Sequence, residues 1–133
     1  MIDFHSHVLP KIDDGAKDVE TSLWMLEESK KQGVTTIVCT PHYYGKKRSP
    51  GSMVKKREES YAHIEGKVPE GIELRFGAEV YFTQDTVVNA EELSLLCIEN
   101  TRYIMLELPF TPKYKQRLFD KIAVIIKHLG GQV

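Results

Sequence analysis

The chain has 133 residues, enough for one domain with a core of its own. Its 18 basic and 19 acidic residues leave a net charge of −1, so charge favours neither nucleic acid nor a membrane surface as partner. No apolar run has transmembrane length, and polar residues begin at Asp3, where a signal peptide would need an apolar core. Cys39 and Cys97 lie far apart in apolar stretches, which suits a reducing compartment. We expect one cytoplasmic domain over residues 1–133, without membrane insertion.

The hydrophobic pattern predicts strands and helices in alternation. In chain order we expect a strand at 1–4, a helix at 18–33, a strand at 35–40, a helix at 54–67, strands at 71–81 and 103–108, a helix at 113–129, and the start of a further strand at 132–133. The run TTIVCT at 35–40 is typical of a strand buried on both faces. This order predicts an α/β fold with a parallel sheet, either open or curled as part of a barrel.

Histidines and carboxylates stand at the ends of the predicted strands. His5 and His7 follow the first strand, His42 follows the second, Glu79 closes the third and Glu107 closes the fourth. The carboxyl ends of parallel strands form the face on which α/β active sites are built, so we expect these side chains to meet there. The pair Asp13 and Asp14 in the first loop would join them.

The H-x-H spacing of His5 and His7 indicates a metal site, because residues i and i+2 of an extended chain point the same way. Imidazole and carboxylate together suit Zn, Mn or Fe, and the absence of paired cysteines argues against a structural zinc site. A carboxylate can also bridge two ions. Clustered metals are a common means of activating water and stabilising phosphoryl transfer.

Each of these residues also has a structural interpretation. An isolated H-x-H is a weak signal, and Glu79 or Glu107 could end its strand in an ion pair with Lys or Arg. Apolar neighbours make a buried, unpaired carboxylate costly, however, which favours an adjacent cation. We expect His63 on the surface of a polar helix, and His128 in a last helical turn, where it complements the helix dipole.

The segment GKKRSPG, at 45–51, has two interpretations. It is either a mobile connection or a rim that grips an anionic substrate. In the second case Lys46, Lys47 and Arg48 supply positive charge, and Tyr43 or Tyr44 stacks on an aromatic ring.

The segment CIENTR, at 97–102, is similar to the Cys-loop-Arg cradle of cysteine-dependent tyrosine phosphatases. That cradle needs five residues between Cys and Arg, usually with glycine among them, so that backbone amides surround the phosphate. Here four residues intervene and none is glycine. We therefore expect Cys97 to be packed in a helix or turn.

Four motifs, FHSHVLPKIDDGA, TPHYYG, FGAEVYF and LELP, resemble in order and spacing the polymerase-and-histidinol-phosphatase (PHP) superfamily. They are most similar to its bacterial manganese-dependent protein tyrosine phosphatases, encoded with capsule and exopolysaccharide genes. DDGA and GAEVY in particular are features of that branch, and the resemblance covers residues 1–133. It implies a cytoplasmic hydrolase with a distorted TIM-like barrel, of which this chain forms about the first four βα units.

The resemblance also implies a role for each candidate residue. The implied ligand sets are His5, His7 and Glu79 for a first ion, Glu79 and Glu107 for a second, and Asp14, rather than Asp13, with His42 for a third. The ion is Mn²⁺, with Fe, Zn or Mg as alternatives. A hydroxide bridging the metals would attack phosphorus in line while the tyrosine phenolate leaves, without a cysteine nucleophile. The implied substrate is a phosphotyrosine protein, such as a bacterial tyrosine kinase of the polysaccharide export system.

The chain also departs from this pattern. Family members run to roughly twice this length and close the barrel. Their next segment carries an A-H-P-E-R-Y motif, with a metal-binding His and a phosphate-contacting Arg, followed by a further Asp and His. None of these occurs up to Val133. We therefore expect an N-terminal half with incomplete ion sites, little phosphatase activity and exposed strand edges that favour a homo-oligomer.

Two other classes remain open. One is a different metal hydrolase, because amidohydrolase barrels also begin with H-x-H and other PHP proteins cleave small phosphomonoesters or nucleic acid. The other is a non-catalytic domain whose incomplete cluster binds one metal or none. Assays with phosphotyrosine peptide, histidinol phosphate and single-stranded DNA distinguish the first class from a tyrosine phosphatase. The metal content of the chain, measured by elemental analysis, tests the second class.

Overall fold

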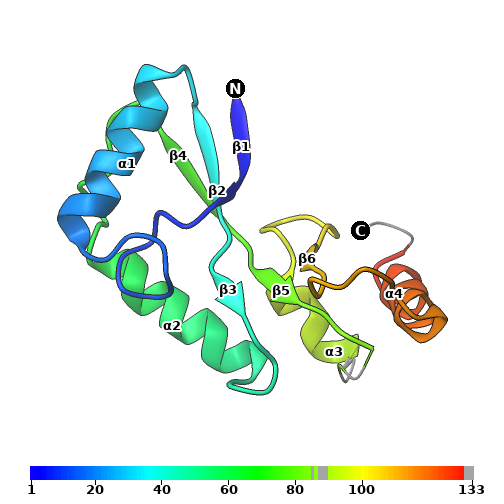
Figure 1. Ribbon diagram of the computed structural model, residues 1–133. Helices are drawn as coiled ribbons and strands as arrows, with labels where there is room; N and C mark the ends of the chain where they lie inside the picture. Colours follow the sequence, from blue (N-terminus) through cyan, green and yellow to red (C-terminus); the bar gives the residue numbers. More distant parts are fainter. Residues whose placement is uncertain (85, 87–89, 131–133) are drawn as a thin grey trace.

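Strands and helices alternate along the chain in the computed structural model, which describes residues 1–84, 86 and 90–130 (Figure 1). The elements are β1 (Ile2–Ser6), α1 (Val19–Lys31), β2 (Thr36–Cys39), β3 (His42–Tyr43), α2 (Pro50–Ala62), β4 (Glu73–Phe76), β5 (Glu79–Tyr81), α3 (Ala90–Leu93), the 3₁₀ turn η1 (Ser94–Leu96), β6 (Met105–Glu107) and α4 (Gln116–His128). The strand predicted to begin at 132–133 lies outside the described residues.

Within the described residues, the strands form two three-stranded sheets with the orders β1-β2-β4 and β3-β5-β6. Every pairing in both sheets is parallel. The predicted α/β class built from parallel βα units is therefore confirmed. Helices α1 and α2 lie beside the first sheet, and α3 and α4 lie toward the other end of the molecule, beside the second (Figure 1).

The single strand predicted over 71–81 is wrong in its extent, because two strands of different sheets occupy this segment. The chain leaves the first sheet after Phe76, and the backbone N–H of Glu79 donates to the Pro41 carbonyl at 3.0 Å as β5 begins. Pro41 lies at the matching break between β2 and β3, where it has no N–H to continue the ladder. As a result His42 and Glu79 begin strands of the second sheet instead of ending strands of the first.

The helix starts follow capping rules. Asp18, the first residue of the predicted helix, caps α1, since its carboxylate accepts from the Thr21 N–H at 2.7 Å. Helix α2 begins four residues before the predicted position 54, because Ser49 caps it and Pro50 occupies the first turn. The end of the GKKRSPG segment is therefore a helix start and not a loop.

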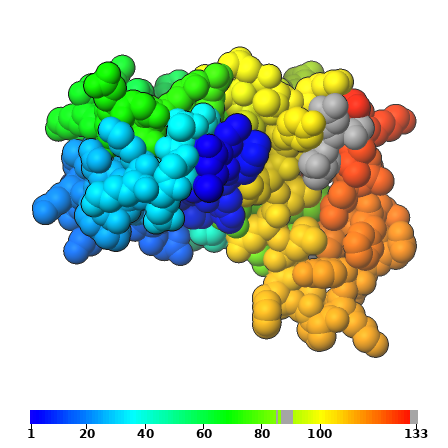
Figure 2. All heavy atoms as spheres, turned by 90° about the horizontal axis from the view of Figure 1, so that it is seen from above, coloured from blue at the N-terminus to red at the C-terminus, as the bar shows by residue number. Residues whose placement is uncertain are grey.

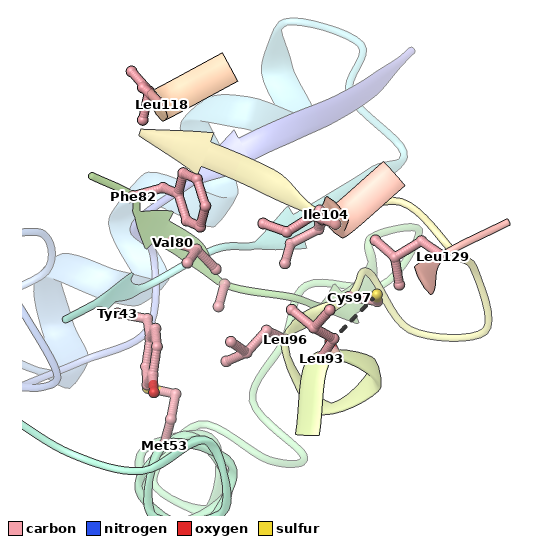
Figure 3. Packing of buried hydrophobic residues seen from close by; sticks show 12 residues of the cluster. Tyr43, Met53, Val80, Phe82, Leu93, Leu96, Cys97, Ile104, Leu118 and Leu129 are labelled. Carbon is pink, nitrogen blue, oxygen red and sulfur yellow. Dashed lines mark hydrogen bonds between the residues drawn. The ribbon is translucent and has the colours of Figure 1, made fainter. Parts of the chain in front are cut away.

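Two separate clusters form the core. The first packs α1 and α2 against the first sheet through residues such as Leu26, Ile37 and Ile64. The second lies around β5 and β6 and includes the residues drawn in Figure 3. Cys97 is buried in this second cluster at the end of η1, and its thiol lies 3.5 Å from the Leu93 carbonyl. The prediction that Cys97 is packed in a turn is confirmed.

The surface around α4 carries large apolar side chains. The segment after β6, coloured yellow-orange, protrudes from the body in the space-filling view (Figure 2). Phe110 in this segment and Phe119 on α4 are exposed, and β1 and β6 are edge strands of their sheets. His63 is exposed as predicted, and His128 lies in the last turn of α4 as predicted. Among the described residues, no helix combines the length and apolar character that crossing a membrane requires.

Candidate metal centre

The loop between β1 and α1 folds back against His7 and so brings the two aspartates beside the strands. The Ala16 N–H donates to the His7 carbonyl at 3.0 Å, and the Gly15 N–H donates to Asp13 Oδ1 at 2.9 Å. A β carbon at Gly15 would lie 2.2 Å from the His7 carbonyl oxygen, so a side chain at this position would displace the loop. The glycine of the DDG motif is therefore required by this close approach.

The carboxylate of Glu79 lies at the centre of three imidazoles. Its Oε2 is 3.0 Å from His5 Nε2, 3.1 Å from His7 Nε2 and 3.2 Å from His42 Nδ1. The two Nε2 atoms of His5 and His7 are themselves 3.1 Å apart, as the H-x-H spacing predicts. His42 and Glu79 are paired in register across β3 and β5. Glu79 is buried, so three strands enclose a carboxylate that faces nitrogen atoms on several sides.

Two further carboxylates complete the cluster around His42. Asp14 Oδ1 lies 3.2 Å from His42 Nε2, and Glu107 Oε2 lies 3.4 Å from His42 Nδ1. Asp14 is largely exposed, whereas Glu107 is partly buried at the end of β6. The structure thus brings together all six residues predicted as ligands, namely His5, His7, Asp14, His42, Glu79 and Glu107.

Three buried polar atoms of this cluster favour a cation. His42 Nδ1, Glu79 Oε2 and Glu107 Oε2 have no hydrogen-bond partner among the described residues, although they lie close together. Buried carboxylate oxygens without donors are costly, and a divalent ion among them would satisfy them. The nitrogen and oxygen donors fit Mn, Fe or Zn. The residues present therefore fit the metal centre that the sequence predicted.

Asp13 has a role that the sequence analysis missed. Its Oδ2 lies 2.9 Å from His7 Nδ1 and accepts from the His42 N–H at 3.0 Å. Burial alone would raise the pKa of Asp13, but hydrogen bonds from His7, Gly15 and His42 hold that pKa below its usual value. The carboxylate thereby turns His7 Nε2 toward Glu79. Metal-binding histidines commonly donate their second N–H to a carboxylate, and an aspartate in a turn six residues after His7 was the available signal.

Residues 1–128 match the sequence pattern of a family described as "Capsular polysaccharide synthesis, CpsB/CapC". The chain belongs to the CpsB/CapC family. Its relatives include the tyrosine-protein phosphatase CpsB of Streptococcus pneumoniae, 33% identical over 87% of this chain and 48% of that protein. Another is the tyrosine-protein phosphatase YwqE of Bacillus subtilis, 32% identical over 90% of this chain and 48% of that protein. The predicted resemblance to bacterial tyrosine phosphatases of capsule synthesis is confirmed.

A solved structure gives the same result for the fold. It is described as "Crystal structures of YwqE from Bacillus subtilis and CpsB from Streptococcus pneumoniae, unique metal-dependent tyrosine phosphatases". The TM-score is 0.68 at 27% identity, over 93% of this chain and 51% of that chain. The chain spans about half the length of the curated CpsB/CapC relatives it matches.

The two tyrosines after His42 lie on opposite sides of β3 in this CpsB/CapC chain. Tyr43 is buried in the second core cluster beside Met53, so its ring is not available to stack on a substrate (Figure 3). Tyr44 instead stacks on His42, with ring centroids 5.7 Å apart, and also contacts the ring of Tyr81. Of the two tyrosines predicted as alternatives for stacking, Tyr44 is the one whose ring contacts the ligand cluster.

The basic residues of the loop lie next to Tyr44. Lys47 Nζ is 5.1 Å from the Tyr44 ring centroid; Lys46 is exposed and Arg48 is half-buried. A cavity of about 750 Å³ is lined by this loop and by apolar residues such as Val80. Positive charge and an aromatic ring thus adjoin the ligand cluster through the contact between Tyr44 and His42.

Proposed function

We propose that this protein hydrolyses phosphotyrosine on proteins in a metal-dependent reaction. The observation that carries the proposal is the Glu79 carboxylate, which faces three imidazoles while its buried oxygen has no hydrogen-bond partner among the described residues. Such a donor set suits a divalent ion. The tyrosine-phosphatase descriptions of CpsB and YwqE, metal-dependent in the solved structures, support the substrate class.

The proposed ligand sets are those that the family resemblance implies. His5, His7 and Glu79 would hold a first ion, Glu79 and Glu107 would hold a second, and Asp14 and His42 would hold a third. In the structure His42 also lies beside Glu79 and Glu107, and His7 and Asp13 lie beside Asp14 and His42. We favour Mn²⁺ over Fe, Zn or Mg, with three ions in the intact enzyme. When bound, such ions lower the pKa of water and neutralise charge on the phosphoryl oxygens.

The protein side chains would orient the metal ligands and the substrate, and none of them would act as the nucleophile. Asp13 fixes His7, and Tyr44 offers a ring beside the cluster for the aromatic group of the substrate. Cys39 is not suited to act as nucleophile, because burial raises the pKa of its thiol to about 12. Burial likewise raises the pKa of Cys97.

The cellular setting is also proposed from the family. A phosphotyrosine protein of a capsule-synthesis system, such as a bacterial tyrosine kinase for polysaccharide export, is the partner we favour, and the cytoplasm is its compartment. Among the described residues β1 and β6 are edge strands, and such edges favour association between copies of the chain.

The test is a substrate panel on the intact enzyme. We expect a phosphotyrosine peptide to be hydrolysed at least about tenfold more efficiently than histidinol phosphate or single-stranded DNA, since the ring of Tyr44 adjoins the cluster. Chelation and dialysis should abolish turnover, and Mn²⁺ should restore it. The control is the double change Cys39→Ser and Cys97→Ser, which should leave turnover intact. Full activity after chelation would refute the metal-dependent mechanism, and a preference for DNA would assign a different substrate.

The basic loop gives a second prediction. Changing Lys46, Lys47 and Arg48 to glutamine should raise KM for an acidic phosphotyrosine peptide by about fivefold or more, because charges at a rim mainly steer encounter. KM for p-nitrophenyl phosphate should change less, and the effect should weaken at high salt. Lys55→Gln, an exposed position on α2, is the matched control. Equal changes for both substrates would show that the loop is only a connection.

A further inference from the structure

Arg57 of α2 reaches from the helix to the break between the two sheets. Its Nη1 donates to the Gly77 carbonyl at 2.6 Å, and its guanidinium carbon lies 5.8 Å from the Phe76 ring centroid. Burial lowers the pKa of this guanidinium, as expected for a cation withdrawn from water. A partly buried charge that donates to a backbone carbonyl fixes that carbonyl more firmly than a neutral donor would.

Gly77 lies between β4 and β5, outside the strand range of either sheet. Its N–H donates to the Cys39 carbonyl at 2.9 Å, while its own carbonyl accepts from Arg57. A β carbon at Gly77 would lie 3.3 Å from Ile98 Cγ1 and 3.6 Å from Thr40 Cγ2, so the space around the peptide is filled. Hydrogen bonds on both sides of Gly77 thus set the direction in which the chain enters β5.

Glu79 is the second residue after this fixed point. Its Oε2 must lie within 3.0–3.2 Å of nitrogen atoms on three histidines, and those histidines come from other segments of the chain. A rotation of the peptide after Gly77 would carry the Glu79 side chain away from them. The orientation of the Gly77 carbonyl therefore contributes to the placement of the Glu79 side chain, together with the bond from the Glu79 N–H to the Pro41 carbonyl.

The same face of α2 also holds the other side of the cluster. Ser60, three residues after Arg57, is buried, and its hydroxyl donates to the Pro10 carbonyl at 2.6 Å. Residues i and i+3 of a helix are neighbours on one face. One helix face thus contacts both the loop that carries Asp13 and Asp14 and the break that precedes Glu79.

We propose that Arg57 is a positioning residue of the metal centre, which holds the Gly77 carbonyl so that the Glu79 carboxylate reaches the three histidines. Arg57 acts through Glu79, and the inference rests on the ligand set given under the proposed function. The alternative is that Arg57 only packs against Phe76 and stabilises the domain. In that case its loss would lower stability without changing the geometry of a bound ion.

The experiment measures Co²⁺ binding and the visible Co²⁺ spectrum for the 133-residue chain and its variants. We expect Arg57→Met to weaken Co²⁺ binding at least about tenfold and to change the spectrum, because supporting residues of metal ligands have effects of this size. Arg57→Gln, whose amide is too short to reach Gly77, should behave in the same way and serves if the first variant does not fold. Lys55→Met, on the exposed side of α2, should leave binding and spectrum unchanged.

The outcomes separate this inference from the ligand set itself. Failure of the unchanged chain to bind Co²⁺ would refute the ligand set, and with it the role of Arg57. If the unchanged chain binds and a folded Arg57 variant binds within twofold with the same spectrum, only the positioning role is overturned. Circular dichroism of each variant establishes that it is folded.

Discussion

Replacement of Glu79 by alanine is expected to lower metal affinity by more than about 100-fold and to abolish turnover of the intact enzyme. Its Oε2 is the atom that approaches His5, His7 and His42, so its loss removes a ligand from two of the three proposed ion sites. Isothermal titration with Mn²⁺ measures the affinity, and hydrolysis of a phosphotyrosine peptide measures the turnover. His5→Ala should likewise abolish turnover without unfolding the domain.

The matched control is Glu73→Ala. Glu73 is an exposed glutamate of β4 that pairs with Arg75 at 2.6 Å, far from the cluster in the strand order. Surface ion pairs contribute little to the free energy of unfolding, so this variant should stay folded and bind Mn²⁺ as the unchanged chain does. Undiminished Mn²⁺ binding by a folded Glu79→Ala variant would show that the ion binds at another place in the chain.

The 133-residue chain by itself is expected to bind at most one ion firmly. His5, His7 and Glu79 give three protein ligands with an open position. Each of the other two sets, as the resemblance implies them, has two protein ligands. The resemblance implies a further metal-binding His and a phosphate-contacting Arg in a motif that residues 1–133 do not contain. Loss of a group that stabilises transition-state charge lowers kcat by about 100-fold or more. Hydrolysis of p-nitrophenyl phosphate by this chain should therefore be slower than by a full-length relative by at least that factor.

Elemental analysis of the purified chain gives the metal stoichiometry, and an assay with added Mn²⁺ gives the rate. A full-length CpsB/CapC relative, assayed alongside, sets the reference rate. Three firmly bound ions and a rate equal to that reference would contradict the expectation. Such a result would mean that residues 1–133 suffice, or that copies of the chain complete one another's sites.

The candidate ligands could be predicted because two simple rules apply to them, one on the repeat of an extended chain and one on the edge of a parallel sheet. An extended chain repeats every two residues, which aligned His5 with His7. Residues that follow parallel strands lie at one edge of the sheet, which grouped His42 and Glu79 just beyond β2 and β4, while Glu107 closes β6. These rules needed only the approximate position of each strand. They did not need the exact ends, which were less well predicted.

The strand breaks escaped prediction because they depend on contacts between distant segments. The segment 71–81 reads as one strand, and the bonds of the Gly77 and Glu79 N–H groups to the Cys39 and Pro41 carbonyls divide it. The break at Pro41 likewise decides which tyrosine faces the cluster. Because His42 lies in β3 and side chains of an extended chain alternate, Tyr44 and not Tyr43 lies on the same side as His42. The role of Asp13 likewise depends on a fold of the loop that Gly15 permits.

The metal cluster lies between two hydrophobic cores that have no described residue in common, and this arrangement affects how the domain unfolds. His5 belongs to a strand of the first sheet, while His42 and Glu79 belong to strands of the second. An ion held by both would add a cross-link between two hydrophobic units that helix α2 also joins. Ion binding to the folded state alone raises its stability, so loading would make the two units melt together at a higher temperature. The metal would then be a structural element of this domain as well as a reagent.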